Sequence, residues 1–322
     1  MFHVKYEQLW AGDEFLSRLE EKAKAEIRTR GYGSAARVDS DLSNPEWFLA
    51  INDIAYSYCP TNRYLYFRKI EGKRPVPTWE SYKGRVLDEL LPEIYRRTLD
   101  YSVKTSLRNL RIAEEVQRSL LETIDTYKTD LGSDSLLNPP SSDEVDEFFD
   151  GLQKLCTYEA AMAGALLDYR ISNLYDINVE TEFRMLFPFD FKLKISSPSL
   201  GISGSAEVDF LLRESILGEI KSSKWYEFYN VGLAGYALAY EADRKKDVNL
   251  GVVVCPLFRR DRNIPIYKNL ANIKIIAEPW RRMFLSKRNR RIELIKKGED
   301  PNKPDDSSDC VGCGFYKECW DN

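Results

Sequence analysis

Apolar residues recur every three or four positions along most of the N-terminal half of the chain, which is the period of an amphipathic helix. Two such stretches run from Asp13 to about Ile27 and from Thr78 to Ser102, and a third runs from about Lys104 to Arg170. The third is interrupted by the segment GSDSLLNPPSSDE, whose two prolines end one helix. Ser141 and Glu144 have the spacing of a capping box, so we expect the next helix to begin there.

The pattern changes near Glu182 to short β-type runs that are broken by Gly, Ser and Pro. These runs are RMLFPFDFKLKIS, SAEVDFLLRE, ILGEIKS and LGVVVC. Between the last two, YNVGLAGYALAYEAD has helical spacing, so we expect a crossover helix and at least one parallel pair of strands. The predicted fold is α/β, a mixed sheet flanked by helices. We divide the chain into a helical N-terminal part (1–103), a helical insertion (104–180), a core with the sheet (181–297) and a C-terminal cysteine segment (298–322).

Composition then narrows the class of protein. The chain has 322 residues and a net charge of −4, which gives no overall attraction to nucleic acid, so any nucleic-acid surface must be local. No apolar run approaches the roughly 18 residues of a membrane span. The start, MFHVKYEQLW, lacks the basic-then-apolar order of a secretory signal, so we expect a cytoplasmic protein with no membrane part. In such a chain, six cysteines favour metal ligands or buried thiols over disulfides.

Two carboxylates and a lysine are the candidate catalytic residues of the predicted sheet. Asp209 interrupts an apolar strand, and Glu219, Ile220 and Lys221 follow ten residues later. Because side chains alternate along a strand, Glu219 and Lys221 share a face while Ile220 packs on the other.

If the two strands are neighbours, Asp209 and Glu219 converge to hold Mg²⁺ or Mn²⁺, with the Ile220 carbonyl as a third oxygen ligand. Lys221 then lies beside the water that would attack a phosphodiester. The alternative is an edge-strand salt bridge between Glu219 and Lys221, with Asp209 in solvent.

Three cysteines lie close together at the end of the sequence, in a C-x₂-C-x₅-C motif: Cys310, Cys313 and Cys319. A zinc site or an iron–sulfur cluster normally takes four ligands. Cys156 and Cys255 lie in apolar segments and fit buried thiols. Cys59 precedes Pro60 and lies near Arg63, whose charge favours a thiolate, so we select Cys59 as the fourth ligand. Spacing alone leaves both an iron–sulfur cluster and zinc open.

Several of these segments together resemble a known family. CPTNRYLYF, GRVLDE, VDF, GEIKSS, the crossover helix with Tyr236, and the final cysteine motif occur in the order found in RecB-like, PD-(D/E)XK nucleases that carry an iron–sulfur cluster. The sequence is most similar to the CRISPR-associated branch that acts in spacer acquisition, in its archaeal variant. The resemblance covers about residues 52–320.

The resemblance implies a PD-(D/E)XK core closed by an iron–sulfur clasp, and metal-dependent trimming of DNA ends before an integrase inserts them. It implies that Asp209 and Glu219 bind Mg²⁺ or Mn²⁺ and that Lys221 is the catalytic lysine. It further implies a cluster, most often 4Fe-4S, whose ligands are Cys59, Cys310, Cys313 and Cys319.

The sequence departs from this family at two positions. Where the family has a histidine four residues after the glycine of the GRVLDE segment, this chain has Asp88, which can bind a metal through oxygen instead. Asp88 lies at the border of the apolar side of its helix, so a solvent-facing position is the alternative. Where the family has a glutamine four residues before Tyr236, this chain has Gly232, and we find no nearby replacement in the sequence.

The best local candidate for a DNA-binding surface is the basic stretch from Arg259 to Lys297. Arg281 and Arg282 are candidate phosphate ligands there, Trp280 or Phe284 could stack on bases, and Tyr236 is a further candidate substrate-binding residue. The alternative is a solvated helix whose aromatic side packs into the core.

The leading interpretation is a metal-dependent DNA exonuclease that acts on single-stranded ends during CRISPR spacer acquisition. Its expected partners are DNA and the integrase proteins of adaptation, and a homo-oligomer is compatible with the sequence. Two alternatives remain: a DNA-binding subunit of the adaptation complex with a weak or inactive site, and a RecB-type repair nuclease.

Overall fold

The computed structural model describes residues 12–56, 59–104, 112–131, 136–172, 178–222, 225–261, 264–270, 273–310 and 312–320. Its helices are α2 (Gly12–Glu26), α3 (Ile51–Ala55), α4 (Arg63–Lys69), α5 (Trp79–Lys104), α6 (Ile112–Leu131), α7 (Ser142–Ser172), α8 (Val179–Leu186), α9 (Tyr229–Arg244), α10 (Glu278–Lys297) and α11 (Tyr316–Trp320). Its strands are β1 (Phe189–Ser196), β2 (Ser205–Leu212), β3 (Ile216–Ile220), β4 (Leu250–Asp261), β5 (Ile264–Leu270) and β6 (Lys274–Ile275).

These strands form one mixed sheet in the order β1-β2-β3-β4-β5, with β6 paired to β4. Neighbouring strands are antiparallel except β3 and β4, which are parallel. Helix α9 connects β3 to β4, as a parallel pair requires. The crossover helix and the α/β class predicted from the sequence are therefore confirmed.

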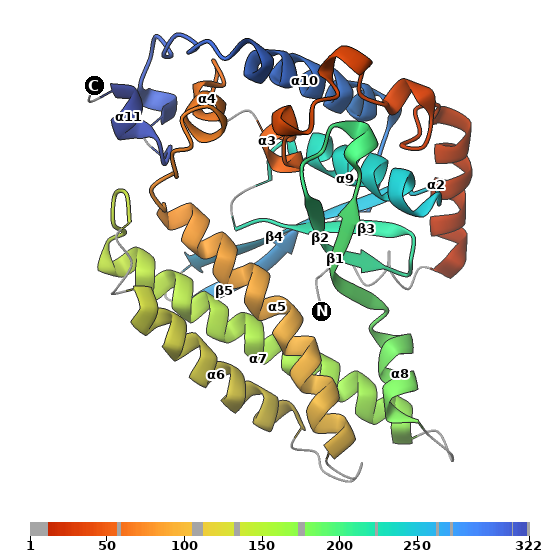
Figure 1. The fold of residues 1–322 in the computed structure, drawn as a ribbon. Coiled ribbons are helices and arrows are strands. Elements are labelled where there is room, and N and C mark those ends of the chain that lie inside the picture. The colour runs from red at the N-terminus through yellow and green to blue at the C-terminus, as the bar shows by residue number, and fades with distance from the viewer. Residues whose placement is uncertain are drawn as a thin grey trace.

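Helices cover both faces of the sheet (Figure 1). On one face, α5, α6 and α7 form a layer of long helices, and on the other lie α3, α9 and α10. Alternation along the strands divides the core accordingly, because Ile216 and Ile220 of β3 join the cluster under α5 while Leu217 joins the cluster under α9. The layer of long helices combines α5, which ends at Lys104, with α6 and α7. The N-terminal part (1–103) and the helical insertion (104–180) that the sequence predicts therefore contribute to one layer.

Hydrogen bonds from single side chains mark where α7 and α8 begin. The backbone N–H of Ser141 donates to Glu144 Oε2 over 2.9 Å, and the N–H of Glu144 donates to Ser141 Oγ over 3.3 Å, which is the predicted capping box before α7. The strand expected from Arg184 onward begins later. Asn178 caps α8 by accepting from the N–H of Thr181 over 3.0 Å, so the segment stays helical to Leu186.

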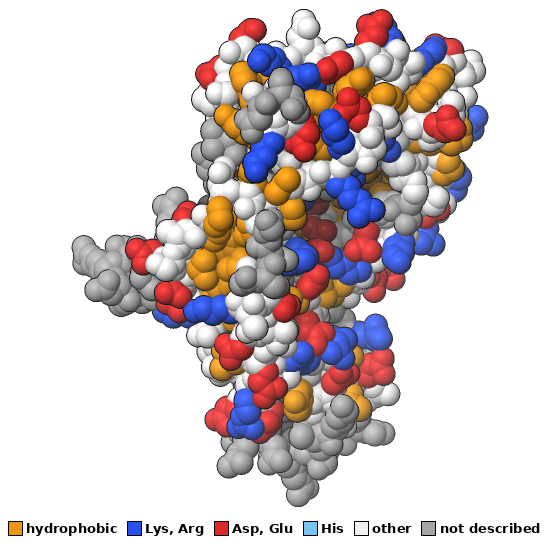
Figure 2. Space-filling view, turned by 60° about the vertical axis from the view of Figure 1, so that its left-hand side comes forward, with side chains coloured by type: hydrophobic (Ala, Val, Ile, Leu, Met, Phe, Trp, Pro, Cys, Tyr) orange, Lys and Arg blue, Asp and Glu red, His pale blue; other side chains and the backbone are white. Residues whose placement is uncertain are grey.

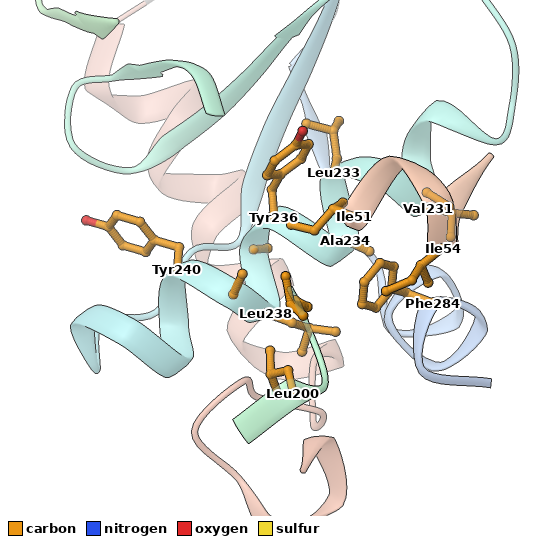
Figure 3. Packing of buried hydrophobic residues seen from close by; sticks show 14 of the residues in the cluster. Ile51, Ile54, Leu200, Val231, Leu233, Ala234, Tyr236, Leu238, Tyr240 and Phe284 are labelled. Atoms are coloured by element: carbon orange, nitrogen blue, oxygen red, sulfur yellow. The ribbon is translucent and has the colours of Figure 1, made fainter. Parts of the chain in front are cut away.

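The packing of α9 against α10 depends on a glycine. A β-carbon added at Gly235 would lie 2.3 Å from the ring of Phe284, so only glycine allows these helices to approach this closely. Phe284 is fully buried beside Ile54 of α3 (Figure 3). Among the described residues, no helix combines the length and the apolar composition needed to cross a membrane.

Candidate active site

The β2–β3 hairpin brings two predicted metal ligands together. Phe210 pairs with Gly218 at the end of the β2–β3 register, so Asp209 and Glu219 are the next residues of the two strands. The backbone N–H of Ile220 donates to Asp209 Oδ2 over 2.6 Å, which holds that carboxylate against β3. This contact argues against the alternative with Asp209 in solvent, and the role of both carboxylates as metal ligands stays a prediction.

Glu219 is buried on the α9 face of the sheet, with 1% of its surface exposed. Tyr56 Oη lies 3.3 and 3.4 Å from its two carboxylate oxygens, and Lys221 Nζ lies 3.6 Å from Oε1. Ile220 packs into the opposite cluster, so Glu219 and Lys221 share a face as the alternation predicts. Charge-assisted hydrogen bonds are usually about 2.7–2.9 Å long. By that standard Tyr56 and Lys221 hold Glu219 only loosely.

Burial and neighbouring charges shift the pKa values of Glu219, Asp209 and Lys221. Burial raises the pKa of Glu219 to about 7, and the positive charge of Lys221 acts in the opposite direction. Burial likewise raises the pKa of Asp209, although Lys221 and the Ile220 N–H act in the other direction. Burial alone would lower the pKa of Lys221, but the charges of Glu219 and Asp209 outweigh it and raise that pKa. Perturbed acids beside a buried lysine are typical of catalytic and binding sites.

Asp88 lies on α5 beside this group. Its side chain is 39% exposed and forms a close ion pair with Lys192 of β1. Burial is the main reason that the pKa of Asp209 is raised, and the negative charge of Asp88 raises it further. Asp88 is thus close enough to interact with Asp209, and its role as a metal ligand stays a prediction.

Lys192 is a residue of this site that the sequence analysis missed. Its φ of +56° is in the left-handed region, which residues other than glycine rarely adopt. The β1–β2 ladder is interrupted between Phe191 and Leu193, where Lys192 lies next to Asp209. From there its ammonium reaches Asp88. No sequence pattern marks a left-handed lysine, so only the structure identifies it.

Tyr56 lies beside Gly232, the position at which the chain departs from the glutamine of the family it resembles. A β-carbon added at Gly232 would lie 3.3 Å from Glu219 Oε2 and 3.3 Å from Tyr56 Cε1. Tyr56 comes from the end of α3, far away in sequence, and offers its hydroxyl to Glu219. The structure thus corrects the expectation of no nearby replacement, because a tyrosine supplies the contact to the carboxylate.

Tyr236 borders the site from α9. It is buried, and its Oη lies 3.5 Å from Asn52 Oδ1, which links α9 to α3. Burial raises the pKa of Tyr236 well above its ordinary value, and the charge of Glu219 adds to this effect. The hydroxyl is therefore neutral, and Figure 3 shows Tyr236 in the buried hydrophobic cluster.

The two arginines proposed to bind substrate have different surroundings. Arg281 is fully buried, pairs with Glu241 at 2.9 Å and donates to the carbonyl oxygen of Val248 over 2.6 Å. Its guanidinium faces the core, which argues against contact with DNA. Arg282 is exposed and pairs with Glu278 one turn earlier at 2.7 Å.

The rest of the basic stretch is only partly described. Phe284 is in the core, and Trp280 is partly buried against the same cluster, so for these two residues the core-packing alternative is the better description. Side chains 257–272, including that of Arg259, lie outside the described set. On the face shown in Figure 2, Lys and Arg side chains lie among Asp and Glu rather than in one continuous basic patch.

The cysteine segment lies against α4. Cys59 and two C-terminal cysteines are buried, and Phe67 of α4 lies 5.8 Å from the ring of Phe315 in the same small cluster. Burial raises the pKa of the Cys313 thiol, and further raising comes from the other three cysteines of the predicted set. The other three thiols of the set therefore lie within electrostatic reach of Cys313.

Arg63 connects this segment to the preceding linker. Its Nη1 lies 3.4 Å from Cys319 Sγ, and its Nη2 pairs with Asp300 at 2.6 Å. The sequence analysis placed this positive charge near Cys59, whereas in the structure it reaches the Cys319 sulfur. Cys156 and Cys255 are buried elsewhere, as expected, and burial raises their pKa values to about 12 and about 11.

Neither cluster of candidate ligands is assembled as a metal site in the described residues. Within the ranges given above, no three His, Cys, Asp or Glu side chains form a group that could hold a metal ion. The donor types still fit their expected partners, since buried carboxylates suit Mg²⁺ or Mn²⁺ and four thiols suit an iron–sulfur cluster or zinc.

Comparison with known proteins identifies relatives of this chain. The model of the family described as CRISPR-associated exonuclease Csa1 matches residues 42–321. A protein of that name from Saccharolobus solfataricus is 28% identical over 187 residues, which cover 54% of this chain and 62% of that protein. One of the same name from Thermoproteus tenax is 22% identical over 275 residues, which cover 84% of each chain. No solved structure matches.

Proposed function

The chain belongs to the Csa1 family of CRISPR-associated exonucleases, and from this premise we propose that it is a metal-dependent DNA exonuclease that trims single-stranded ends for spacer acquisition. The observation that carries the proposal is the buried group on β2 and β3, where Asp209 accepts from the Ile220 N–H over 2.6 Å and Lys221 Nζ lies 3.6 Å from Glu219 Oε1. On this basis the mixed sheet is the core of a RecB-like, PD-(D/E)XK nuclease.

Asp209, Glu219 and the Ile220 carbonyl would hold Mg²⁺ or Mn²⁺, with Asp88 as a further oxygen ligand. The cation would supply an activated water and neutralise charge on the phosphate. The protein contributes the orientation of its ligands. The Ile220 N–H holds Asp209, and Tyr56 offers its hydroxyl to Glu219.

Lys221 would orient the attacking water and stabilise negative charge on the phosphate. The neighbouring carboxylates hold its pKa above the ordinary value, so the side chain is a cation at neutral pH and acts through its charge and N–H donors. Lys192 keeps Asp88 paired in this structure. On binding of a cation, that lysine would be free to turn toward the DNA backbone.

For the cysteine segment we propose an iron–sulfur cluster, 4Fe-4S, held by Cys59 together with Cys310, Cys313 and Cys319. Such a cluster would join the chain end to the segment before α4. Protein purified without oxygen should then be brown and contain iron and acid-labile sulfide, and Cys59→Ala should lose both.

Cys156→Ala and Cys255→Ala are the matched controls and should keep the iron, because both thiols are buried elsewhere. Zinc without sulfide in the parent protein, or loss of iron in either control variant, would contradict this assignment.

DNA and the integrase proteins of CRISPR adaptation are the proposed partners. The Lys192–Asp88 pair favours one second candidate, a DNA-binding subunit with a weak or inactive site, because it occupies a predicted ligand. A RecB-type repair nuclease would use the same group on a different substrate.

The test is a nuclease assay with Mg²⁺ or Mn²⁺ on single- and double-stranded oligonucleotides labelled at either end. We expect stepwise shortening of single strands by the parent protein and none by Lys221→Ala. Equal cutting by both proteins would place the activity elsewhere, and no cutting by the parent in either metal would favour the binding subunit.

A further inference from the structure

Two large aromatic side chains are exposed just after the catalytic lysine. Trp225 is 40% exposed and Tyr226 is 36% exposed, and they follow Lys221 in the loop that leads to α9. Ser222, at the start of this loop, donates its hydroxyl to the Glu80 carbonyl of α5 over 3.2 Å. The loop is therefore anchored to the helical layer next to the candidate active site.

A continuous series of rings connects Tyr226 to the buried carboxylate. Tyr226 stacks on Phe228 with the ring planes 10° apart and the centroids at 5.1 Å. Phe228 in turn lies 5.4 Å from the ring of Tyr56, whose hydroxyl reaches Glu219. The outermost ring is thus two ring contacts away from the residue that binds Glu219.

Positive charge lies beside Trp225 and beside Tyr56. Lys274 Nζ lies 4.5 Å from the ring centroid of Trp225, and Lys221 Nζ lies 5.4 Å from that of Tyr56. Proteins that bind single-stranded nucleic acid combine these two elements, because aromatic rings stack on bases while cations neutralise the phosphates between them. The arrangement has the chemistry of a single-strand binding site.

We propose that Trp225 and Tyr226 form a stacking platform for bases of the single strand whose phosphodiester lies at Glu219 and Lys221. This inference rests on the nuclease function proposed above and adds a substrate-binding site to it. The platform selects single strands, because bases paired within a duplex cannot turn out onto the rings. It binds without regard to sequence, because every base has an aromatic face.

The test measures binding separately from cleavage. Tyr226→Leu and Trp225→Leu are made in a Glu219→Gln background, with Tyr169→Leu as the matched control, since Tyr169 on α7 is an exposed tyrosine at 74%. The probe is a single-stranded oligonucleotide with 2-aminopurine near one end, whose fluorescence falls when the base stacks. Anisotropy gives the dissociation constant, and a thermal melt checks the fold.

We expect the Glu219→Gln protein to quench the probe, and Tyr226→Leu to weaken binding by roughly tenfold and reduce the quenching. Tyr169→Leu should change neither. An oligonucleotide with an abasic residue at the stacked position has no base to stack there. It should therefore bind the Glu219→Gln protein with and without Tyr226→Leu equally.

Equal affinity and equal quenching in all variants would overturn the platform, as would quenching lost in Tyr169→Leu. If the wild type digests DNA while Tyr226→Leu binds normally, the platform is wrong and the nuclease function stands. If the wild type digests nothing while quenching still depends on Tyr226, the nuclease function is wrong and the platform stands.

Discussion

Two regions on the α9 side of the sheet each bury a glutamate, and they satisfy it differently. Glu241 of α9 accepts from Arg30 and Arg281 at 2.9 Å each and from the backbone N–H groups of Gly31 and Val248 at 2.8 and 3.2 Å. Glu219 of β3 has Tyr56 and Lys221 at 3.3 to 3.6 Å. Both side chains are almost completely buried.

The difference separates a structural carboxylate from a functional one. A buried charge with short bonds to fixed donors is compensated, and it connects the elements that supply those donors. Glu219 is under-compensated, which is why burial raises its pKa to about 7. A carboxylate in that condition gains from binding a cation. We therefore expect substitution at Glu241 to cost stability and substitution at Glu219 to cost activity.

The largest expected effect is on cleavage. Glu219→Gln removes the charge but keeps the shape, so the initial rate on a labelled single strand should fall by about 10³ or more. The melting temperature should stay the same or rise, because the cost of burying a charge is removed. A Glu219→Gln protein that melts much earlier than the wild type would mean that both glutamates are structural.

The next effect is on stability. Arg281→Met leaves Glu241 buried with one partner fewer, so the free energy of unfolding should fall by about 3–5 kcal/mol. Arg282→Met is the control from the next position, because its exposed pair with Glu278 should contribute less than about 1 kcal/mol. Urea unfolding measures both. Similar losses in the two variants would remove the distinction between the buried and the exposed pair.

A smaller effect is expected at Lys192, where the ammonium competes with a cation for Asp88. Lys192→Gly should bind Mn²⁺ several-fold more tightly than the wild type, and glycine also accepts the left-handed backbone without strain. Asp88→Ala should bind Mn²⁺ more weakly. Lys194→Gly, on the exposed part of the same strand, is the control. Unchanged Mn²⁺ affinity in Lys192→Gly and Asp88→Ala would mean that Asp88 is only a structural partner of Lys192.

The smallest effect concerns pH. Burial raises the pKa of Glu219 to about 7, so Mn²⁺ affinity should fall as the pH drops through 7 and protons compete for the carboxylate. Tyr56 favours the charged form, so Tyr56→Phe should raise that pKa further and move the loss of affinity to higher pH. At a pH well above 8, the Mn²⁺ affinities of Tyr56→Phe and the wild type should differ only a few-fold. A profile that does not move in Tyr56→Phe would show that the hydroxyl does not act on Glu219.

Sequence patterns predicted the crossover helix α9 and the shared face of Glu219 and Lys221, because connection and alternation rules are local. The pairing of β2 with β3 was only a condition of the predicted site. These patterns could not distinguish Arg281 from Arg282, since both occur in one basic run and only tertiary packing buries the first. Tyr56 and Lys192 were missed for a related reason. One reaches the site from a distant segment and the other depends on an unusual backbone conformation.

We propose that Glu219 and Asp209 bind a cation, whereas Glu241, which is fully paired, does not. The most direct test is calorimetric titration of Mn²⁺ into DNA-free wild-type protein, Glu219→Gln and Arg282→Met at a pH above 7. The account predicts saturable binding to the wild type and to Arg282→Met, and its loss in Glu219→Gln with the fold intact. Equal binding by all three proteins would contradict it.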